Sequence, residues 1–156
     1  MDTRRFLCDD RDAPQPNQEN HKQPPLSKTD LYLKHLHEEG FNPQVDEDGD
    51  VIFRCESRTY VLIQDERDPT FVRLLLPNFW AIESEEEHLR ALMTANQVNA
   101  KMKIVKLVMV RRSVWASIEL LIDSPAHFVN VFNRCVQIIP DPTREFRQAM
   151  QQLSDE

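Results

Sequence analysis

Glycine is scarce in this chain, with only two glycines among 156 residues. A phosphate-binding loop needs several glycines because its backbone must approach the phosphate closely, so glycine-rich nucleotide sites are excluded. The three cysteines, Cys8, Cys55 and Cys135, are spaced too widely for a disulfide framework or a zinc motif. No apolar run approaches the roughly 20 residues of a membrane-spanning helix, and residues 1–23 lack the apolar centre of a signal peptide. We therefore predict a protein of the reducing cytoplasm that has no membrane partner.

Positive charge is also in deficit, since 26 acidic residues face 19 basic ones and the net charge is −7. Binding to nucleic acid depends on clustered Lys and Arg, so this balance argues against a nucleic-acid partner. The charges are unevenly distributed. Residues 38–87 contain 14 acids against 4 arginines, whereas residues 88–156 contain 9 basic residues against 6 acids. Such an asymmetry can steer a charged partner or support self-association, although a solvated acidic face is the simpler interpretation.

The chain divides into a tail and one domain. Residues 1–26 hold four of the ten prolines together with many Asn, Gln and Asp. A segment of this composition cannot bury enough apolar surface to offset the entropy lost on ordering, so we predict a disordered N-terminal tail. The remaining residues, 27–153, have the length of a single domain.

Capping patterns predict the first half of this domain. Ser27 begins a helix that Gly40 ends, since glycine adopts the left-handed conformation at low cost. The pair Asp48-Gly49 is a hairpin signal, and three strands follow at residues 51–55, 60–64 and 70–76. Ser84, with a glutamate three residues later, caps a second helix. Residues spaced three or four apart lie on one face of a helix, and we expect that face of this helix to pack on the sheet. Its members are Leu89, Leu92, Met93 and Asn96.

The second half adds a hairpin and a split helix. Strands are predicted at residues 104–110 and 114–123, followed by a helix from Ser124 to about Ile139. Pro140 should break that helix, and Thr143 should cap a short last one. The resulting order is α-β-β-β-α-β-β-α with a split final helix. It predicts an α+β, two-layer domain whose antiparallel sheet has its helices on one face.

Potential metal ligands occur in two acidic places. Asp46, Asp48 and Asp50 surround the hairpin glycine, but a calcium loop would need that glycine at its sixth position and a helix after it. Glu85 and His88 have the Glu-x-x-His spacing of di-iron sites, yet a helix cap explains these residues without a metal. No nucleophile has a base and an orienting group beside it, so we predict a non-enzymatic protein. A small-ligand or metal-responsive sensor that uses both acidic places is the alternative.

Three aromatic residues are the predicted partner contacts. In the strand at 114–123 one alternating set is wholly apolar and should face the helices, which places Trp115 on the opposite side of the sheet. Phe79 and Trp80 lie where the strand at 70–76 ends. Exposed aromatic side chains on a sheet face mark possible interfaces, although local packing under a loop is the slightly better explanation, since isolated apolar residues are common on surfaces.

Parts of the chain resemble a known family. These parts are VRLLLPNFW at residues 72–80, SEEEHLRALM at 84–93 and the hairpin VDEDGDVIF at 45–53. They are similar to the YbjN-type family of bacterial sensory transduction regulators, over roughly residues 28–150. The resemblance implies a type III secretion chaperone-like fold that is usually dimeric, binds extended client segments and has no enzymatic activity. We therefore expect a protein-binding module, chaperone-like or a regulatory adaptor, that forms a homodimer and takes a protein client.

Overall fold

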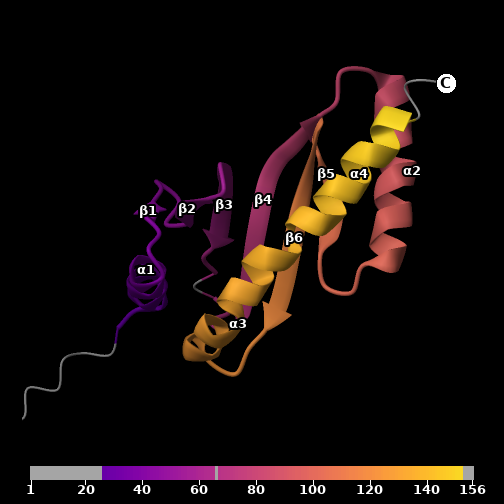
Figure 1. Cartoon of the computed structure of the whole chain (residues 1–156). Helices are drawn as coiled ribbons and strands as arrows, with labels where there is room; N and C mark the ends of the chain where they lie inside the picture. Colours follow the sequence, from indigo (N-terminus) through magenta and orange to yellow (C-terminus); the bar gives the residue numbers. More distant parts are fainter. Residues whose placement is uncertain (1–25, 66, 153–156) are drawn as a thin grey trace, which may run out of the picture.

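The computed structural model describes residues 26–65 and 67–152. The predicted disordered tail lies outside these residues, apart from Leu26. The described residues form four helices and six strands (Figure 1). In chain order these are α1 (Lys28–Glu38), β1 (Gln44–Val45), β2 (Val51–Cys55), β3 (Arg58–Ile63), β4 (Phe71–Ala81), α2 (Glu85–Lys101), β5 (Lys106–Val110), β6 (Ser113–Leu121), α3 (Pro125–Ile138) and α4 (Pro140–Gln152). The predicted α+β class and the general order of elements are confirmed.

All six strands form one antiparallel sheet in the order β1-β2-β3-β4-β6-β5. Alternate residues of each strand point toward the helices, because successive side chains of a strand face opposite sides. Aromatic rings fill the space between sheet and helices: Phe53 of β2 lies 5.4 Å from Phe132 of α3, and Tyr32 of α1 lies 5.3 Å from Phe128. The buried residues of this sheet face include Val51, Phe53, Tyr60, Leu62, Val72, Leu74, Leu76, Leu107, Val114, Ala116 and Ile118.

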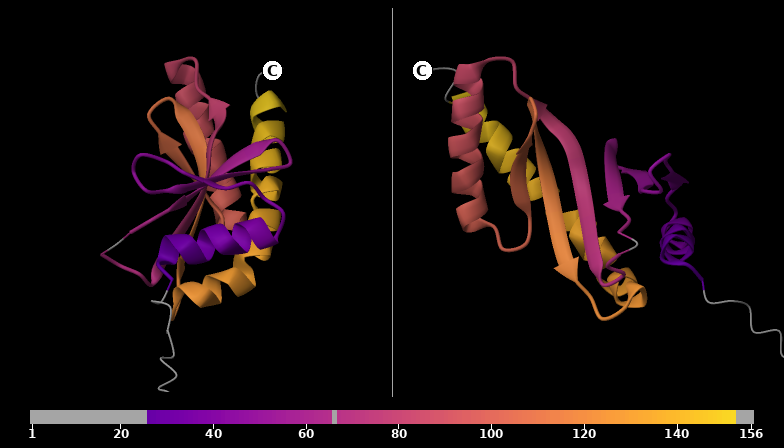
Figure 2. Two further views of the ribbon diagram at one scale, coloured as in Figure 1. Left: turned by 90° about the vertical axis from the view of Figure 1, so that its left-hand side faces the viewer. Right: turned by 180° about the vertical axis from the view of Figure 1, so that it is seen from behind.

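The opposite face of the sheet has no helix over its centre. Seen from behind, α3 and α4 pass beyond strands β4 and β6, and none of the described helices lies in front of these two strands (Figure 2). The helix α2 packs against α4 and β5, and α1 packs against α3 and β2. Over residues 26–65 and 67–152 the structure is therefore two layers deep, and none of these residues forms a helix over the second face of the sheet.

The predicted caps at Ser27 and Ser84, the end of α1 at Gly40 and the hairpin turn are confirmed. Ser27 Oγ accepts a hydrogen bond from the backbone N–H of Asp30 at 3.0 Å, and Ser84 Oγ accepts one from Glu87 at 3.1 Å. Gly40 ends α1 with a φ of +86°, a conformation that side-chain-bearing residues rarely adopt. The hairpin also includes the two-residue strand β1, which sequence patterning missed because two residues are too short to show alternation.

The strand β4 is longer than predicted. Its end was expected at residue 76, before Pro77, but the strand continues to Ala81. The register shifts on the way: Leu76 pairs with Ala116, and Trp80 pairs with Val114, so three residues of β4 oppose one of β6. Proline lacks the N–H that a ladder needs, and a bulge is where a strand tolerates that loss. The prediction was wrong because Pro77 bulges the strand instead of ending it.

The predicted orientation of α2 is also wrong. The large apolar side chains of Leu89 and Met93 are 61% and 59% exposed. The buried side of α2 consists instead of small residues, Ala91, Thr94, Ala95 and Val98. Small side chains let α2 approach α4 and β5 closely, and this close packing decides the rotation of the helix. The apolar stripe of the sequence, which also includes Leu92, therefore points outward.

The start of the last helix differs from its prediction as well. Helix α4 begins at Pro140, not after Thr143, because proline is well suited to the first turn of a helix. Thr143 is buried, and its hydroxyl donates to the carbonyl oxygen of Pro140 at 2.9 Å, so it is not a cap. At the preceding helix, Ser124 precedes Pro125 as predicted but makes no side-chain capping bond.

A side chain covers part of the outer edge of the sheet at β5. Asn99 of α2 donates from Nδ2 to the carbonyl oxygen of Leu107 at 2.9 Å, and its Oδ1 accepts the backbone N–H of the same residue at 2.7 Å. The amide thus makes the pair of bonds that a neighbouring strand would make.

Across the described part of the chain, the helices are too short or too polar to cross a bilayer.

Candidate partner-binding surface

The uncovered side of the sheet forms an apolar surface, which we call the open sheet face. Its apolar members point away from the helices from four adjacent strands. Leu75 at its centre is 8% exposed although none of the described helices covers it, because neighbouring side chains shield it. A shielded apolar centre with a partly exposed surround resembles the core and rim of a protein interface. The surrounding apolar side chains are Val61, Ile63, Phe71, Val108 and Trp115.

Few charges interrupt the open sheet face. Arg73 of β4 pairs with Glu119 of β6, with 2.9 Å between Nε and Oε1, and both side chains are substantially exposed. The Arg73 guanidinium also lies 5.3 Å from the centre of the Phe71 ring. An exposed ion pair contributes little to stability, so these charges can rearrange around a partner at low cost.

Trp115 stands at one end of this face beside a hollow. Its Nε1 donates to Asn78 Oδ1 at 2.9 Å and to Ser113 Oγ at 2.8 Å. These bonds satisfy the polar end of the indole and leave the half-buried ring in place as apolar surface. The hollow has a volume of about 460 Å³ and also includes Arg111 and Arg112 in its lining. The positive φ of Asn78, +50°, shows that the bulge in β4 shapes this end of the face.

The other two predicted aromatics lie on the helix side of the sheet. Phe79 is buried, and its ring centre is 5.5 Å from that of Phe146 in α4. The Trp80 ring lies 5.9 Å from the same Phe146 ring. Both rings reach α4 although they are consecutive in the chain, because the bulge breaks the alternation of β4. The structure therefore does not bring Phe79 and Trp80 together with Trp115.

Trp80 is linked to the start of α2 through Glu87. Its Nε1 donates to Glu87 Oε1 at 2.9 Å, while Glu87 Oε2 accepts the backbone N–H of Glu83 at 2.7 Å. These hydrogen bonds to the carboxylate, first of all the one from Glu83, lower the pKa of Glu87 below its usual value. The predicted capping box thus also holds the bulged end of β4 against α2.

Glu87→Gln should lower the free energy of unfolding by about 1 kcal/mol at neutral pH, because it weakens this capping box. A carboxyl with a depressed folded-state pKa stabilises the fold above its unfolded-state pKa, and that contribution disappears as the pH falls through the folded-state pKa. The difference between wild type and variant should therefore shrink in acid, as measured by urea unfolding over a pH series. The control is Glu86→Gln, because Glu86 lies in the same helical turn, is exposed and forms an ion pair with the half-buried Arg90. Equal pH profiles for the two variants would contradict the assignment.

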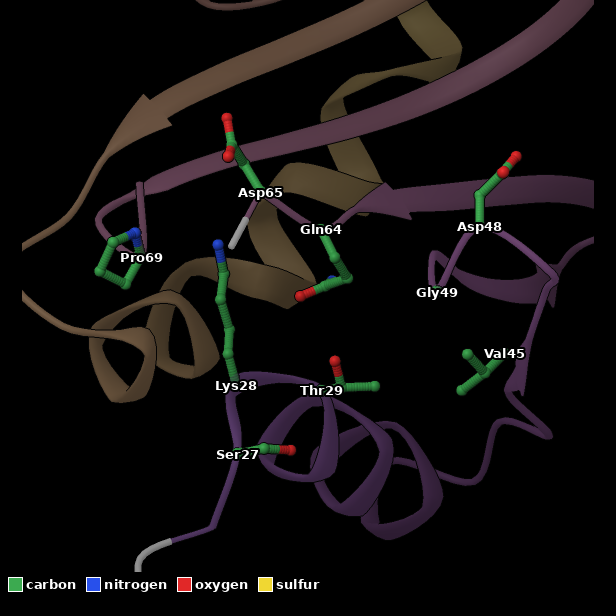
Figure 3. Close-up of a pocket in the computed structure, with 9 residues that line it drawn as sticks. All are labelled: Ser27, Lys28, Thr29, Val45, Asp48, Gly49, Gln64, Asp65 and Pro69. Carbon is green, nitrogen blue, oxygen red and sulfur yellow. The ribbon is translucent and has the colours of Figure 1, made fainter. Parts of the chain in front are cut away.

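The aspartates of the acidic hairpin accept hydrogen bonds from backbone N–H groups of the hairpin and of Gln64. Asp46 Oδ1 accepts the backbone N–H groups of Asp48 and Asp50 at 3.0 and 2.9 Å, and Asp50 Oδ1 accepts that of Gln64 at 2.7 Å. Partial burial is the main cause that raises the pKa of Asp50. Beside this turn lies a hollow of about 410 Å³, but the carboxylates of Asp48 and Asp65 point away from it (Figure 3).

The acidic residues at the start of α2 also bond to groups of the protein itself. Glu85 Oε1 lies 3.3 Å from Arg112 Nη1, and the backbone N–H of His88 bonds to Ser84 within the first turn of α2. Among residues 26–65 and 67–152, no group of three or more His, Cys, Asp or Glu side chains is placed to hold a metal ion. These contacts give the sensor alternative no support.

A second exposed surface was missed from the sequence. It consists of Leu89, Leu92 and Met93, and we call it the α2 surface. Residues spaced by three and four positions share one side of a helix, so the three side chains form one patch. The alanines at positions 91 and 95 were the available signal, since small residues can form the packed side of a helix when the helix lies close to its neighbours.

Comparison with known proteins agrees with this architecture. A family model described as "TY-Chap1: T3SS (YopN, CesT) and YbjN peptide-binding chaperone 1" matches residues 30–151. Curated proteins gave no match. The matched span covers all six strands and nearly all of the four helices, and it confirms the resemblance to YbjN-type proteins and secretion chaperones. The chain therefore belongs to the TY-Chap1 family of peptide-binding chaperones.

Proposed function

We propose that this protein binds an extended segment of a client protein on its open sheet face and acts as a non-enzymatic chaperone or regulatory adaptor. The observation that carries the proposal is the apolar sheet face that no described helix covers, with Leu75 at its centre and Trp115 at its end. Contiguous exposed apolar surface on a soluble fold marks an interaction site. Membership of a peptide-binding family supports the same function.

The layout of the face favours an extended segment as the occupant. Its apolar side chains come from parallel rows across adjacent strands: Val61 lies opposite Leu75, and Val108 lies opposite Trp115. A chain laid across these rows presents alternate side chains to the surface, as in other modes of strand recognition. The paired charges of Arg73 and Glu119 can supply polar contacts at the rim.

We also propose that the protein is a homodimer, as the family resemblance implied. The α2 surface supports this proposal because it places three large apolar side chains on the outside of one helix. Burying a large apolar side chain contributes about 1.5–3 kcal/mol, so a few such side chains at a two-fold axis can stabilise a pair of chains. The α2 surface is separate from the open sheet face, so the dimer would leave the client surface accessible.

Trp115→Ala should weaken client binding by about tenfold or more, because truncating a large aromatic contact residue at an interface often costs 2 kcal/mol or more. The measurement is binding of the full chain to an array of random peptides, quantified against wild type. Trp115→Phe, which keeps an apolar ring, should retain most of the binding. Val131→Ala removes an exposed apolar side chain from α3, on the helix side, and should leave the array signal unchanged.

Thermal unfolding of the same variants separates binding from folding. A folded Trp115→Ala protein that binds the array like wild type would refute the open sheet face as the client site. If Trp115→Ala unfolds, Val61→Glu and Val108→Glu test the same face, since both side chains are partly exposed. Unchanged binding by these two variants would refute the proposal equally.

A further inference from the structure

We propose that a groove on the helix side of the sheet binds a client segment in which a large apolar residue is followed by acidic residues. The groove lies between the loop from α2 to β5 and the junction of α3 and α4. The inference rests on the proposed peptide-binding function and names the chemistry of one client motif. It concerns a surface different from the open sheet face.

The floor of the groove is apolar. Val105 is buried beneath it, Ile138 of α3 is half-buried, and Ile104 is 41% exposed. An exposed isoleucine beside a concave apolar floor leaves apolar area for a partner to cover. The groove has a volume of about 250 Å³. This volume lies below the roughly 300–1,000 Å³ of most small-molecule sites, so the groove suits one inserted side chain better than a whole cofactor.

Two cations flank this floor. Lys103 comes from the loop before β5 and Arg134 from α3, and both side chains are exposed. Within the described part of the chain, neither has an ion-pair partner. The one acid in the lining, Asp141, already bonds to Arg144. The groove therefore presents uncompensated positive charge in a protein whose net charge is −7.

Neighbouring cations differ in this respect. Lys101 lies 2.6 Å from Glu145 Oε1, and Lys106 donates to the carbonyl oxygens of Asn99 and Met102 at 3.1 and 2.9 Å. These lysines have structural partners, which sets Lys103 and Arg134 apart as groups available to a ligand. Arginine can bind a carboxylate through two parallel hydrogen bonds, and lysine acts as a point charge.

An apolar side chain in the groove, followed by carboxylates, satisfies both features together. The apolar residue would cover Ile104 and Ile138, and the next one or two acidic residues would reach Arg134 or Lys103. A purely acidic ligand would leave the floor exposed, and a purely apolar one would leave the cations without partners. Charge complementarity therefore selects the mixed segment.

The test uses fluorescence anisotropy with the full chain and a labelled peptide in which leucine and phenylalanine precede two aspartates between glycine-serine flanks. Lys103→Glu with Arg134→Glu should weaken binding by at least about tenfold, since two charge-assisted bonds are lost. Asp141→Asn should tighten binding a few-fold because it removes the acid of the lining, a gain that structural damage cannot mimic. Salt should weaken binding to wild type and have less effect on the double variant.

Matched controls decide the outcome. Lys34→Glu changes one charge on α1 and should leave the affinity unchanged. Peptides with serines in place of the apolar pair, or lysines in place of the aspartates, should lose binding. Unchanged affinity in the double variant would overturn the groove. If Trp115→Ala abolished binding while the double variant did not, the peptide would occupy the open sheet face, and the proposed function would stand without this inference.

Discussion

Phe146→Ala should lower the free energy of unfolding by about 3–5 kcal/mol, the usual effect of removing a buried aromatic ring. Phe146 is fully buried in α4 and contacts the rings of both Phe79 and Trp80. Its loss would leave a cavity between α4 and the bulged end of β4, and the surrounding rings could fill that cavity only in part. Equilibrium urea unfolding of wild type and variant measures the change directly.

Two variants bracket this result. Gln148→Ala, at an exposed position of the same helix, should change stability by no more than about 0.5 kcal/mol. Phe146→Leu keeps most of the volume and should lose less than the alanine variant. A loss below about 1 kcal/mol for Phe146→Ala would show that Phe79 and Trp80 are not held by α4. They would then be free to serve as the partner contacts that the sequence predicted.

Leu89→Glu combined with Met93→Glu should convert the proposed dimer into a monomer. Each glutamate would place a charge in a buried apolar contact. Because both protomers of a two-fold dimer carry the substitutions, four charges would be buried in the interface. A loss of about 3 kcal/mol or more raises the dissociation constant at least 100-fold. Sedimentation equilibrium over a concentration series measures this constant for wild type and variant.

The control for the dimer is Leu121→Glu. Leu121 is the most exposed large apolar residue of the described part, at 80%, and it lies at the end of β6, away from the α2 surface. This variant carries the same kind of substitution and should remain dimeric. A monomeric wild type would refute the dimer itself. A dimeric double variant would instead show that the chains associate through another surface.

Local patterns in the sequence predicted the starts of α1, α2 and α3 and the open sheet face. Ser27 and Ser84 are caps because each serine oxygen bonds to a backbone N–H only three positions away. Alternation along residues 114–122 correctly placed Trp115 on the side opposite the helices, since period-two spacing fixes the side of a strand from sequence alone. Such features depend on a few neighbouring residues, so they can be derived without the tertiary structure.

Features set by distant residues could not be derived in this way. The rotation of α2 depends on how closely Ala91 and Ala95 approach α4 and β5, which no local spacing encodes. The continuation of β4 past Pro77 depends on its pairing with β6, where Val114 provides a partner for Trp80. The groove flanked by Lys103 and Arg134 joins segments about 30 residues apart, so its cations are not recognisable as a pair in the sequence.

The amide of Asn99 makes the two edges of the sheet unequal. A foreign strand that adds at β5 must first break both bonds between Asn99 and Leu107, whereas residues 53–55 of β2 extend beyond their short neighbour β1. Exposed strand edges are the usual templates for runaway sheet growth and fibril formation. Since the Asn99 side chain blocks part of the β5 edge, edge-to-edge pairing of one molecule with the next through both of its edges is hindered. A member of a peptide-binding family can thus keep one accessible sheet edge while the other edge resists strand addition.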